Sequence, residues 1–423
     1  MVRLDKNKSF TEDKSIESLP LPEKVFIPLI QHIGRPATPQ VRIGDLVYLG
    51  QKLASSSSTI STSVHTSVSG RIVSLQDWPH PVLGKARTIV IENDKKDTSL
   101  FTPRSHEQID RLTPEEIRGI VFEAGIVGMG GAGFPTHIKL NPPKSIDTLI
   151  INGAECEPYL TGDYRLMVEK TKEILKGIEL ISRCLRAKDV FIAIEDDKPE
   201  AIKAFNHGLC NTGYGLRILR SYYPQGGEKQ LIKNILGKEV PTGKLPFDVG
   251  VVVHNVATAF AIYEAVYFNK PLYERVVTVT GNCLNNPKNL LVRIGTPIRE
   301  LIDFCGPLQK QPFKIIIGGP MMGIAQYTDD VPVIKTTTAV ILLDREEAAL
   351  NEEKPCIRCG ACVKECPMGL MPCLINLVSQ KGLWFKAEEL GAMDCIECGL
   401  CSYVCPAKRR LVQSIKRAKL EIR

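Results

Sequence analysis

The sequence has no stretch that combines the length and the apolar purity of a membrane span. The nearest stretch, residues 249–268, contains His254, Asn255 and Glu264 and is better explained as a buried strand that turns into a helix. A basic, apolar and small-residue leader is also missing, because residues 1–24 are polar and charged. We therefore expect a chain that does not cross a bilayer and is not exported, and whose fourteen cysteines remain reduced.

Size and charge set further limits. A chain of 423 residues exceeds one ordinary core and suggests three or four domains, and its 43% hydrophobic and 24% charged residues are typical of a globular protein. The net charge is +7, and residues 408–423 hold seven basic residues against one acid, Glu421. Leu411, Ile415 and Leu420 in this segment suit a basic amphipathic helix, which could meet anionic lipid, an acidic partner or nucleic acid, or could be a solvated helix end without a partner. Nucleic acid is the least favoured, since no aromatic platform or binding motif accompanies the charge.

Eight of the fourteen cysteines form two copies of one pattern near the C-terminus. The spacing is C-x2-C-x2-C-x3-C followed by proline, and the second copy lies 39 residues after the first. The copies are Cys356, Cys359, Cys362 and Cys366, and Cys395, Cys398, Cys401 and Cys405, followed by Pro367 and Pro406. Bacterial ferredoxins bind [4Fe–4S] clusters with this spacing, so the sequence predicts a protein that moves single electrons.

In this pattern the fourth cysteine of each copy binds the other cluster. One cluster is therefore expected to take Cys356, Cys359, Cys362 and Cys405, and the other Cys366, Cys395, Cys398 and Cys401. Structural zinc and a disulfide framework are less favoured, because zinc sites use separated cysteine pairs or Cys/His sets and disulfides imply export. Cys373, just past the first motif, is expected to be a packed thiol near a cluster rather than a ligand.

Periodicity and turn signals divide the rest of the chain. They predict a small β domain at about residues 20–100, in which residues 55–69, nearly all Ser and Thr, form an exposed loop or edge. Helices and strands then alternate, which predicts an α/β domain with a largely parallel sheet. The predicted strands are 148–151, 190–194, 216–219 and 249–253, and the predicted helices are one capped by Thr113 and those at 165–185, 200–209, 228–236 and 257–268. Residues 271–345 predict a small α+β module with a helix at 298–304.

A glycine-rich segment precedes the first of these strands. Residues 128–136 contain G-x-G-x-x-G, but a helix precedes them, and Pro135 blocks the helix that a dinucleotide-binding fingerprint needs. Four glycines still leave backbone N–H groups uncovered, which suits close approach to a phosphate or a planar ring. A tight structural turn is the alternative, and it is less favoured because a turn rarely needs four glycines with Lys139 close behind.

An acidic motif, Asn152 to Pro158, follows the 148–151 strand. Acids at the carboxyl end of a strand lie where open α/β sheets bind ligands, so Glu155 and Glu157 could hold ribose hydroxyls or orient a cofactor edge. A solvated loop would explain each acid singly, but not their pairing with the glycine segment.

The segments GMGGAGFPTHIKL and NGAECEP resemble the flavin and NADH site of the flavoprotein subunit of respiratory complex I. The whole chain resembles more closely the C subunit of the Rnf complex, the ferredoxin:NAD oxidoreductase of bacterial membranes, through LPLPEKVFIPLIQHIG, VHTSVSGRIVSL, YPQGGEKQLI and the doubled cysteine motif. His137 and Cys156 stand where complex I has glycine, and the N-terminal GGIHP stretch of the family is absent.

The resemblance implies a multidomain α/β and α+β fold in four parts. These are a lipoyl-like β sandwich (1–105), an α/β domain for FMN and NADH (106–270), a β-grasp (SLBB) module (271–349), and a helical ferredoxin-type domain with two [4Fe–4S] clusters (350–423). The residues implied to cradle FMN are Gly128, Gly130, Gly131, Gly133, Phe134 and Lys139. Asn152, Glu155 and Glu157 would complete the flavin and nicotinamide site, and Gly227, Glu228, Asn255 and Thr258 match later positions of that pocket.

By this resemblance the chain is a peripheral electron-transfer subunit on the cytoplasmic face of the bacterial cell membrane, with integral, peripheral and ferredoxin-type partner subunits. A flavin is needed because nicotinamide carries a hydride whereas a cluster accepts one electron. No catalytic proton-transfer triad is expected, and ion translocation would belong to the partners. Two alternatives are a soluble flavin and iron–sulfur reductase of a corrinoid or amino-acid reductase system, and a non-enzymatic iron–sulfur relay adaptor with a vestigial flavin pocket.

Overall fold

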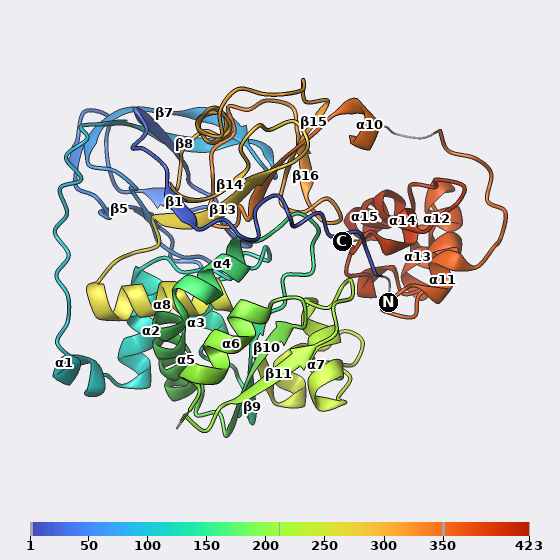
Figure 1. Ribbon diagram of the computed structural model, residues 1–423, viewed down its shortest axis with the longest axis horizontal. Helices are drawn as coiled ribbons and strands as arrows, with labels where there is room; N and C mark the ends of the chain where they lie inside the picture. Colours follow the sequence, from blue (N-terminus) through green and yellow to red (C-terminus); the bar gives the residue numbers. More distant parts are fainter. Residues whose placement is uncertain (1–2, 211, 349–351, 423) are drawn as a thin grey trace.

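The computed structural model describes residues 3–210, 212–348 and 352–422, and Figure 1 shows four parts along the chain. Two β-rich parts lie side by side, the α/β part lies below them, and the cysteine-rich helical part stands at one side. The predicted division at 349/350 lies outside the described residues. None of the described helices is both long and apolar enough to cross a membrane.

The first part is a β sandwich, as predicted. One sheet has the strand order β2-β8-β7-β4 and the other β3-β5-β6. The strands are β2 (Lys24–Pro28), β3 (Thr38–Pro39), β4 (Leu46–Val47), β5 (Lys52–Ser55), β6 (Val64–His65), β7 (Gly70–His80) and β8 (Gly84–Asn93). Val25 and Ile27 of β2 and Ile89 and Ile91 of β8 are buried in the core that the two sheets enclose.

The serine-rich segment is only partly the exposed loop that the sequence suggested. Residues 55–60 are partly exposed, whereas residues 61–69 are buried and include β6 at the edge of its sheet, so the prediction of an exposed loop is wrong for residues 61–69 and that of an edge is right. They pass between the sandwich and the α/β part, where Thr62 Oγ1 donates to Phe122 O at 3.2 Å. The Lys335 ammonium donates to Ser63 O at 2.8 Å. Polar groups of residues 61–69 are therefore hydrogen-bonded to neighbouring parts of the chain. From the composition alone we expected these groups to face water.

The second part is an α/β layer whose sheet has the order β11-β10-β9-β12, with every pair parallel. Its elements are α1 (His106–Asp110), α2 (Pro114–Glu123), α3 (Thr136–Lys139), β9 (Thr148–Gly153), α4 (Gly162–Glu169), α5 (Thr171–Leu185), β10 (Asp189–Glu195), α6 (Pro199–Gly208), β11 (Gly215–Leu219), α7 (Glu228–Leu236), η1 (Pro246–Val249), β12 (Val251–Asn255) and α8 (Val256–Phe268). Asn152 and Asn255 are partners in the register of β9 and β12, so their side chains start from the same edge of the sheet.

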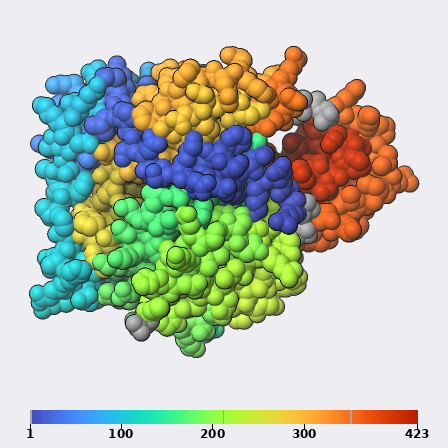
Figure 2. Space-filling model, viewed as in Figure 1, coloured from blue at the N-terminus to red at the C-terminus, as the bar shows by residue number. Residues whose placement is uncertain are grey.

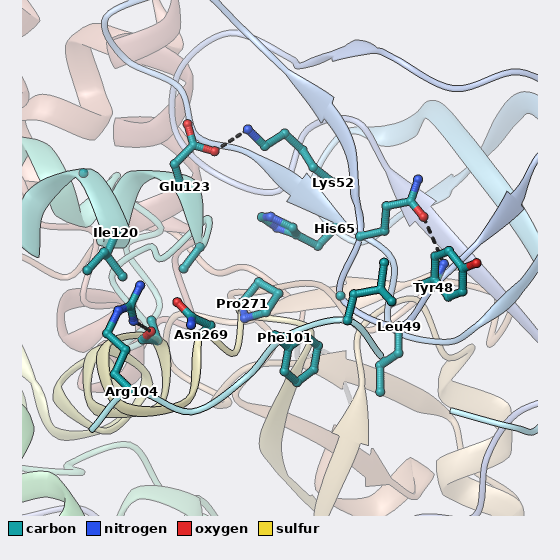
Figure 3. Close-up of a pocket in the computed structure, with 16 residues that line it drawn as sticks. Tyr48, Leu49, Lys52, His65, Phe101, Arg104, Ile120, Glu123, Asn269 and Pro271 are labelled. Atoms are coloured by element: carbon teal, nitrogen blue, oxygen red, sulfur yellow. Dashed lines mark hydrogen bonds and ion pairs between the residues drawn. The ribbon is translucent and has the colours of Figure 1, made fainter. Parts of the chain in front are cut away.

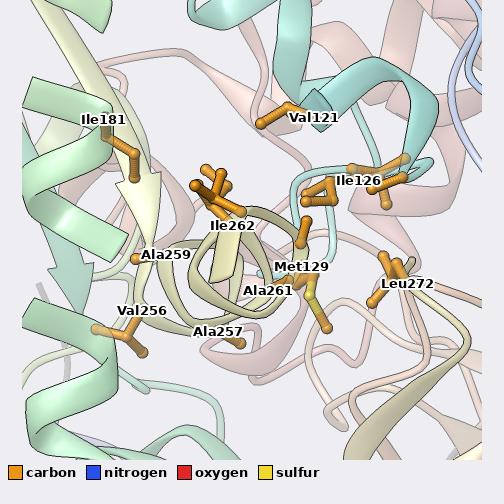
Figure 4. Packing of buried hydrophobic residues seen from close by; sticks show 14 of the residues in the cluster. Val121, Ile126, Met129, Ile181, Val256, Ala257, Ala259, Ala261, Ile262 and Leu272 are labelled. Carbon is orange, nitrogen blue, oxygen red and sulfur yellow. The ribbon is translucent and has the colours of Figure 1, made fainter. Parts of the chain in front are cut away.

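Helix α8 lies at the centre of this core. Figure 4 shows Ala261 next to Met129 of the glycine segment, and Ala259 on the opposite side of the helix, toward Ile181 of α5. A Cβ at Gly177 of α5 would stand 1.9 Å from Ala259 O, so the two helices cross too closely for any larger residue there. Because α8 is buried on nearly all sides, its apolar run is a core helix and not a membrane span.

The third part is a six-stranded sheet with the order β1-β14-β13-β17-β15-β16. Its elements are β1 (Ile16–Ser18), β13 (Glu274–Thr280), β14 (Lys288–Arg293), α9 (Ile298–Phe304), β15 (Lys314–Ile317), β16 (Ile324–Gln326), β17 (Ala339–Leu343) and α10 (Arg345–Ala348). Strand β1 comes from the start of the chain and pairs in parallel with β14. Figure 2 shows this N-terminal segment, in dark blue, lying across the front of the molecule between the third part and the α/β part.

The fourth part is helical. Its elements are α11 (Ala361–Lys364), α12 (Pro372–Gln380), α13 (Trp384–Glu389), η2 (Ala392–Asp394), α14 (Leu400–Tyr403) and α15 (Leu411–Ile422). The predicted basic helix exists as α15, but Leu411 and Ile415 face the domain core, and Leu420 is exposed. Lys416 and Lys419 pair with Glu397. The predicted basic amphipathic helix is therefore present, with its apolar side packed in its own domain; what its basic side meets stays a prediction, and Arg423 lies outside the described residues.

Candidate functional site

The glycine segment forms a closed loop with an open outer side. Gly128 N donates to Phe134 O at 2.8 Å and Gly133 N to Gly128 O at 3.1 Å. Gly131 and Gly133 have φ values of +100° and +61°, which favour glycine. The N–H groups of Gly130, Gly131 and Ala132 donate to no other described residue, and the three residues are exposed. Uncovered N–H groups of this kind fit a phosphate or the edge of a flavin ring.

Other parts of the chain hold this loop in place. Met129 N donates to Thr258 Oγ1 at 3.0 Å, and Thr258 is fully buried in the first turn of α8. Asn255 caps α8, accepting from Ala257 N at 2.9 Å, and a Cβ at Gly130 would touch the Asn255 side chain. Thr258 and Asn255, both predicted, therefore lie directly under the loop.

The later predicted residues meet at the rim of the same region. Lys139 on α3 forms an ion pair with Glu228, the first residue of α7, at 2.7 Å. Gly227 precedes that helix, and Asn152 Nδ2 donates to Gly226 O at 2.9 Å. Residues far apart in the sequence are thus joined by direct contacts that their spacing alone could not reveal.

The two acids of the acidic motif are bound to different parts of the chain. Glu155 accepts from Asp163 N at 2.9 Å and stands 3.8 Å from the buried Lys8 ammonium. Glu157 accepts from Met321 N at 3.1 Å and Met322 N at 2.9 Å in the third part. Burial raises the pKa of Glu157 to about 7, against these hydrogen bonds, which lower it.

Several polar residues near the loop were not predicted. Asp163 accepts from Asn255 Nδ2 at 2.6 Å, and burial, followed by the charge of Glu155, raises the pKa of Asp163 to about 7. Arg275 of the third part donates to Lys335 O and, at 3.4 Å, to Met129 O. Glu195 ends β10, is fully buried, and has no hydrogen-bond partner for either oxygen among the described residues. The sequence offered one signal for Glu195, its position at the carboxyl end of a predicted strand, where open α/β sheets bind ligands.

The cysteines of the fourth part separate into two sets. Cys366, Cys395, Cys398 and Cys401 line one cavity, walled by apolar residues that include Ile396 and Ile415. Burial raises the pKa of Cys398 to about 11 and that of Cys401 to about 12. These thiols stay protonated until metal replaces the protons. Four thiols around one cavity fit a cubane cluster.

The remaining cysteines of this part do not line that cavity. Cys362 and Cys405 pack in one apolar cluster with Leu411, Val412 and Cys401 of the first set, whereas Cys356 and Cys359 are exposed. Cys373 is half-buried in the same cluster, and burial and then the neighbouring Cys373 thiol raise the pKa of Cys362 to about 11. Cys373 is therefore packed, as predicted, and its exclusion from the ligands stays a prediction.

The α/β part contacts the buried cysteine set directly. Tyr223 OH donates to Cys398 O at 2.8 Å, and Gln230 Nε2 donates to Pro367 O at 3.0 Å. Tyr223 and Cys398 pack in one apolar cluster with Cys156, the residue that separates the two acids. The α/β part thus packs directly against the buried cysteine set.

A separate cavity of about 570 Å3 lies between the sandwich and the α/β part. Figure 3 shows Lys52 and His65 on one wall, Arg104 and Ile120 on the other, and the ion pair of Lys52 with Glu123 above. None of the predicted site residues lines this cavity.

Four family descriptions match successive parts of the chain. They are the RnfC barrel sandwich hybrid domain (residues 2–96), the Nuo51 FMN-binding domain (121–264), the SLBB domain (276–325) and the 4Fe-4S dicluster domain (355–409). The sandwich, the α/β layer and the helical cysteine-rich part correspond to the predicted fold classes.

Two relatives match over nearly the whole chain. The C subunit of the proton-translocating ferredoxin:NAD(+) oxidoreductase complex of Clostridium ljungdahlii is 47% identical and is aligned over 100% of this chain and 93% of its own length. The C subunit of the Na(+)-translocating ferredoxin:NAD(+) oxidoreductase complex of Acetobacterium woodii is 45% identical over 95% of this chain and 91% of its own length. An NAD+-reducing [NiFe]-hydrogenase structure shares the fold with a TM-score of 0.51, at 16% identity over 76% of this chain and 67% of that chain. With its order of domains and its identity to these relatives, the chain belongs to the family of C subunits of the Rnf ion-translocating oxidoreductase complexes.

Proposed function

We propose that this chain is the peripheral subunit of a membrane complex that passes electrons between NAD(H), through FMN, and two [4Fe–4S] clusters, while partner subunits translocate ions. It lies on the cytoplasmic face of the bacterial cell membrane. The observation that carries the proposal is the direct contact between Tyr223 in the glycine-loop domain and Cys398 in the buried cysteine set. When bound, FMN exchanges a hydride with NAD(H) and single electrons with clusters.

The flavin is held by the uncovered amides of the glycine loop. Gly128, Gly130, Gly131, Gly133 and Phe134 form its cradle, and Lys139 supplies a cation at the rim. Thr258 and Asn255 fix the loop from below through Met129 N and the cap of α8. Asn152, Glu155, Glu157, Gly227 and Glu228 complete the flavin and nicotinamide pocket.

The thiolates are divided as the motif predicts. Cys366, Cys395, Cys398 and Cys401 hold one cluster, and their shared cavity supports this assignment. Cys356, Cys359, Cys362 and Cys405 hold the other, supported by the common packing of Cys362 and Cys405. The first set lies against the α/β part and the second reaches the surface.

Anaerobic purification of the full chain tests the proposal. We expect about eight irons and one flavin per chain, with the flavin and then the clusters reduced by NADH. Full iron content without flavin would favour the relay adaptor instead. Co-purification with corrinoid or amino-acid reductase components, and without integral membrane subunits, would favour the soluble reductase.

A further inference from the structure

The cavity between the sandwich and the α/β part is separate from the proposed flavin and cluster sites. Its volume of about 570 Å3 lies within the range of roughly 300–1,000 Å3 that is usual for small-molecule sites. Such sites often lie where two domains meet, as this cavity does. The electron-transfer function does not account for it.

Much of the cavity wall is apolar and closely packed. A Cβ on Gly50 would stand 2.7 Å from the Phe101 ring and 3.0 Å from Pro271, so these three residues are in direct contact. Leu49 and Ile120 line the same space, and Figure 3 shows Phe101, Pro271 and Ile120 around it. A fixed aromatic ring with apolar neighbours fits a flat, apolar ligand body.

The charged side chains on the wall leave one cation without an opposite charge. Lys52 forms an ion pair with Glu123, so these two charges offset each other. Burial, followed by the charges of Lys335 and Lys52, holds the pKa of His65 well below its usual range, so the imidazole is neutral at pH 7. Arg104 forms no ion pair within the described part of the chain. The cavity therefore carries a net charge of about +1.

The guanidinium of Arg104 is held by one of its three nitrogens. Nη1 donates to Ala265 O at 3.1 Å and to Val266 O at 2.6 Å, near the end of α8. Nε and Nη2 donate to none of the residues that the structure describes. Together these two N–H groups form the side of a guanidinium that binds a carboxylate through two parallel hydrogen bonds.

We propose that this cavity binds a small organic anion that has one carboxylate and a flat, apolar body. The carboxylate binds Nε and Nη2 of Arg104, and the body lies against Phe101 and Ile120. A polyphosphate is disfavoured because Arg104 alone would not balance its charges, and inorganic phosphate would leave the apolar wall uncovered. Binding is non-covalent and requires neither flavin nor clusters, so the inference goes beyond the proposed function.

Isothermal titration calorimetry of the full chain with naphthaleneacetate and with naphthaleneacetamide tests this site. The two probes have the same aromatic body, and only the first carries a negative charge. Naphthaleneacetate should bind saturably, and the amide should bind about tenfold or more weakly, because hydrogen bonds between charged groups are stronger than neutral ones. This comparison needs no variant.

A substitution in α2 then locates the bound probe. Gly119 lines the cavity, and a Cβ there would meet nothing within 4 Å, so the leucine of Gly119→Leu can occupy the cavity without displacing its neighbours. This variant should lose detectable binding of naphthaleneacetate. Glu115→Leu places the same side chain at an exposed position of α2 that does not line the cavity, and it should bind the probe as wild type does.

Three outcomes would overturn the proposal. They are no saturable binding of naphthaleneacetate to wild type, equal affinities for the acid and the amide, and undiminished binding to the Gly119→Leu variant. Iron content and circular dichroism show whether each variant is folded. None of the three outcomes bears on the reduction of the chain by NADH, so the proposed function is tested separately.

Discussion

At the residue scale, the ligands of a metal cluster are the side chains that line the same cavity. Cys366 lies 29 positions before Cys395 in the sequence, yet both line the same cavity. Cys373 follows Cys366 by only seven positions, but it lies beside Cys362 and does not line that cavity. Proximity in the sequence therefore does not identify the ligands, and the exchange of the fourth cysteine does.

Substitution of these two thiols should give opposite results. Cys366→Ala removes one of the four thiolates from the buried set, so the iron content should fall from about eight to about four per chain. Cys373→Ala is the matched control and should keep about eight irons, because it removes a thiol that the proposal leaves unligated. Iron analysis and EPR of the anaerobically purified variants measure both. Two intact clusters in the Cys366 variant would refute the exchanged ligand sets.

At the element scale, local signals in the sequence predicted the ends of several helices correctly. Thr113 caps α2 and Pro114 begins it, as expected, and α7 and α9 have the predicted bounds. The predicted helix at 165–185 is instead two helices that meet at Lys170, which has non-helical dihedral angles of −129° and 30°. No glycine or proline marks that break, so no local signal in the sequence predicts it.

The crossing of α5 and α8 gives a prediction at this scale. Gly177→Ala would place a methyl group 1.9 Å from Ala259 O, so the helices must separate, at a cost of about 1–3 kcal/mol. Gly119→Ala in α2 is the control, because its Cβ would meet nothing within 4 Å. It should stabilise by roughly 0.5–1 kcal/mol, since alanine loses less entropy in a helix. The thermal unfolding midpoints of the two variants and of wild type measure both effects. Equal midpoints for Gly177→Ala and Gly119→Ala would contradict the close crossing of the two helices.

At the scale of the whole molecule, side chains from distant parts meet where no motif marks them. Asp163, Asn255 and Arg275 converge beside the glycine loop from α4, β12 and β13. The glycine loop, the acids and the cysteines could be predicted because each is a local pattern. The polar residues that hold these features in place could not all be predicted in the same way. Asp163 and Arg275 belong to no local motif, and their contacts exist only in the folded molecule.

Lys335 links three parts of the molecule. Its buried ammonium donates to Ser63 O at 2.8 Å and Gly125 O at 2.6 Å, and burial lowers its pKa from 10.5 to about 7. Between pH 7 and 10.5 the unfolded chain holds this proton and the folded chain does not, so stability should rise with pH in that window. The gain should be on the order of a few kcal/mol.

Lys335→Met should remove this dependence on pH. The thermal midpoint of wild type should rise, relative to that of the variant, between about pH 7 and pH 10. Lys203→Met, at an exposed position, controls for the loss of a positive charge. Parallel pH profiles for wild type and Lys335→Met would show that the buried ammonium keeps its proton throughout.

Strand β1 also has a consequence for biosynthesis. Ile16 pairs with Asn289, so the first strand to leave the ribosome waits for about 270 more residues before its partner exists. The sandwich and the α/β part can form on the nascent chain earlier. The six-stranded sheet closes only late in translation, and until then the N-terminal segment can contact only the α/β part, through residues such as Lys8 and Thr11.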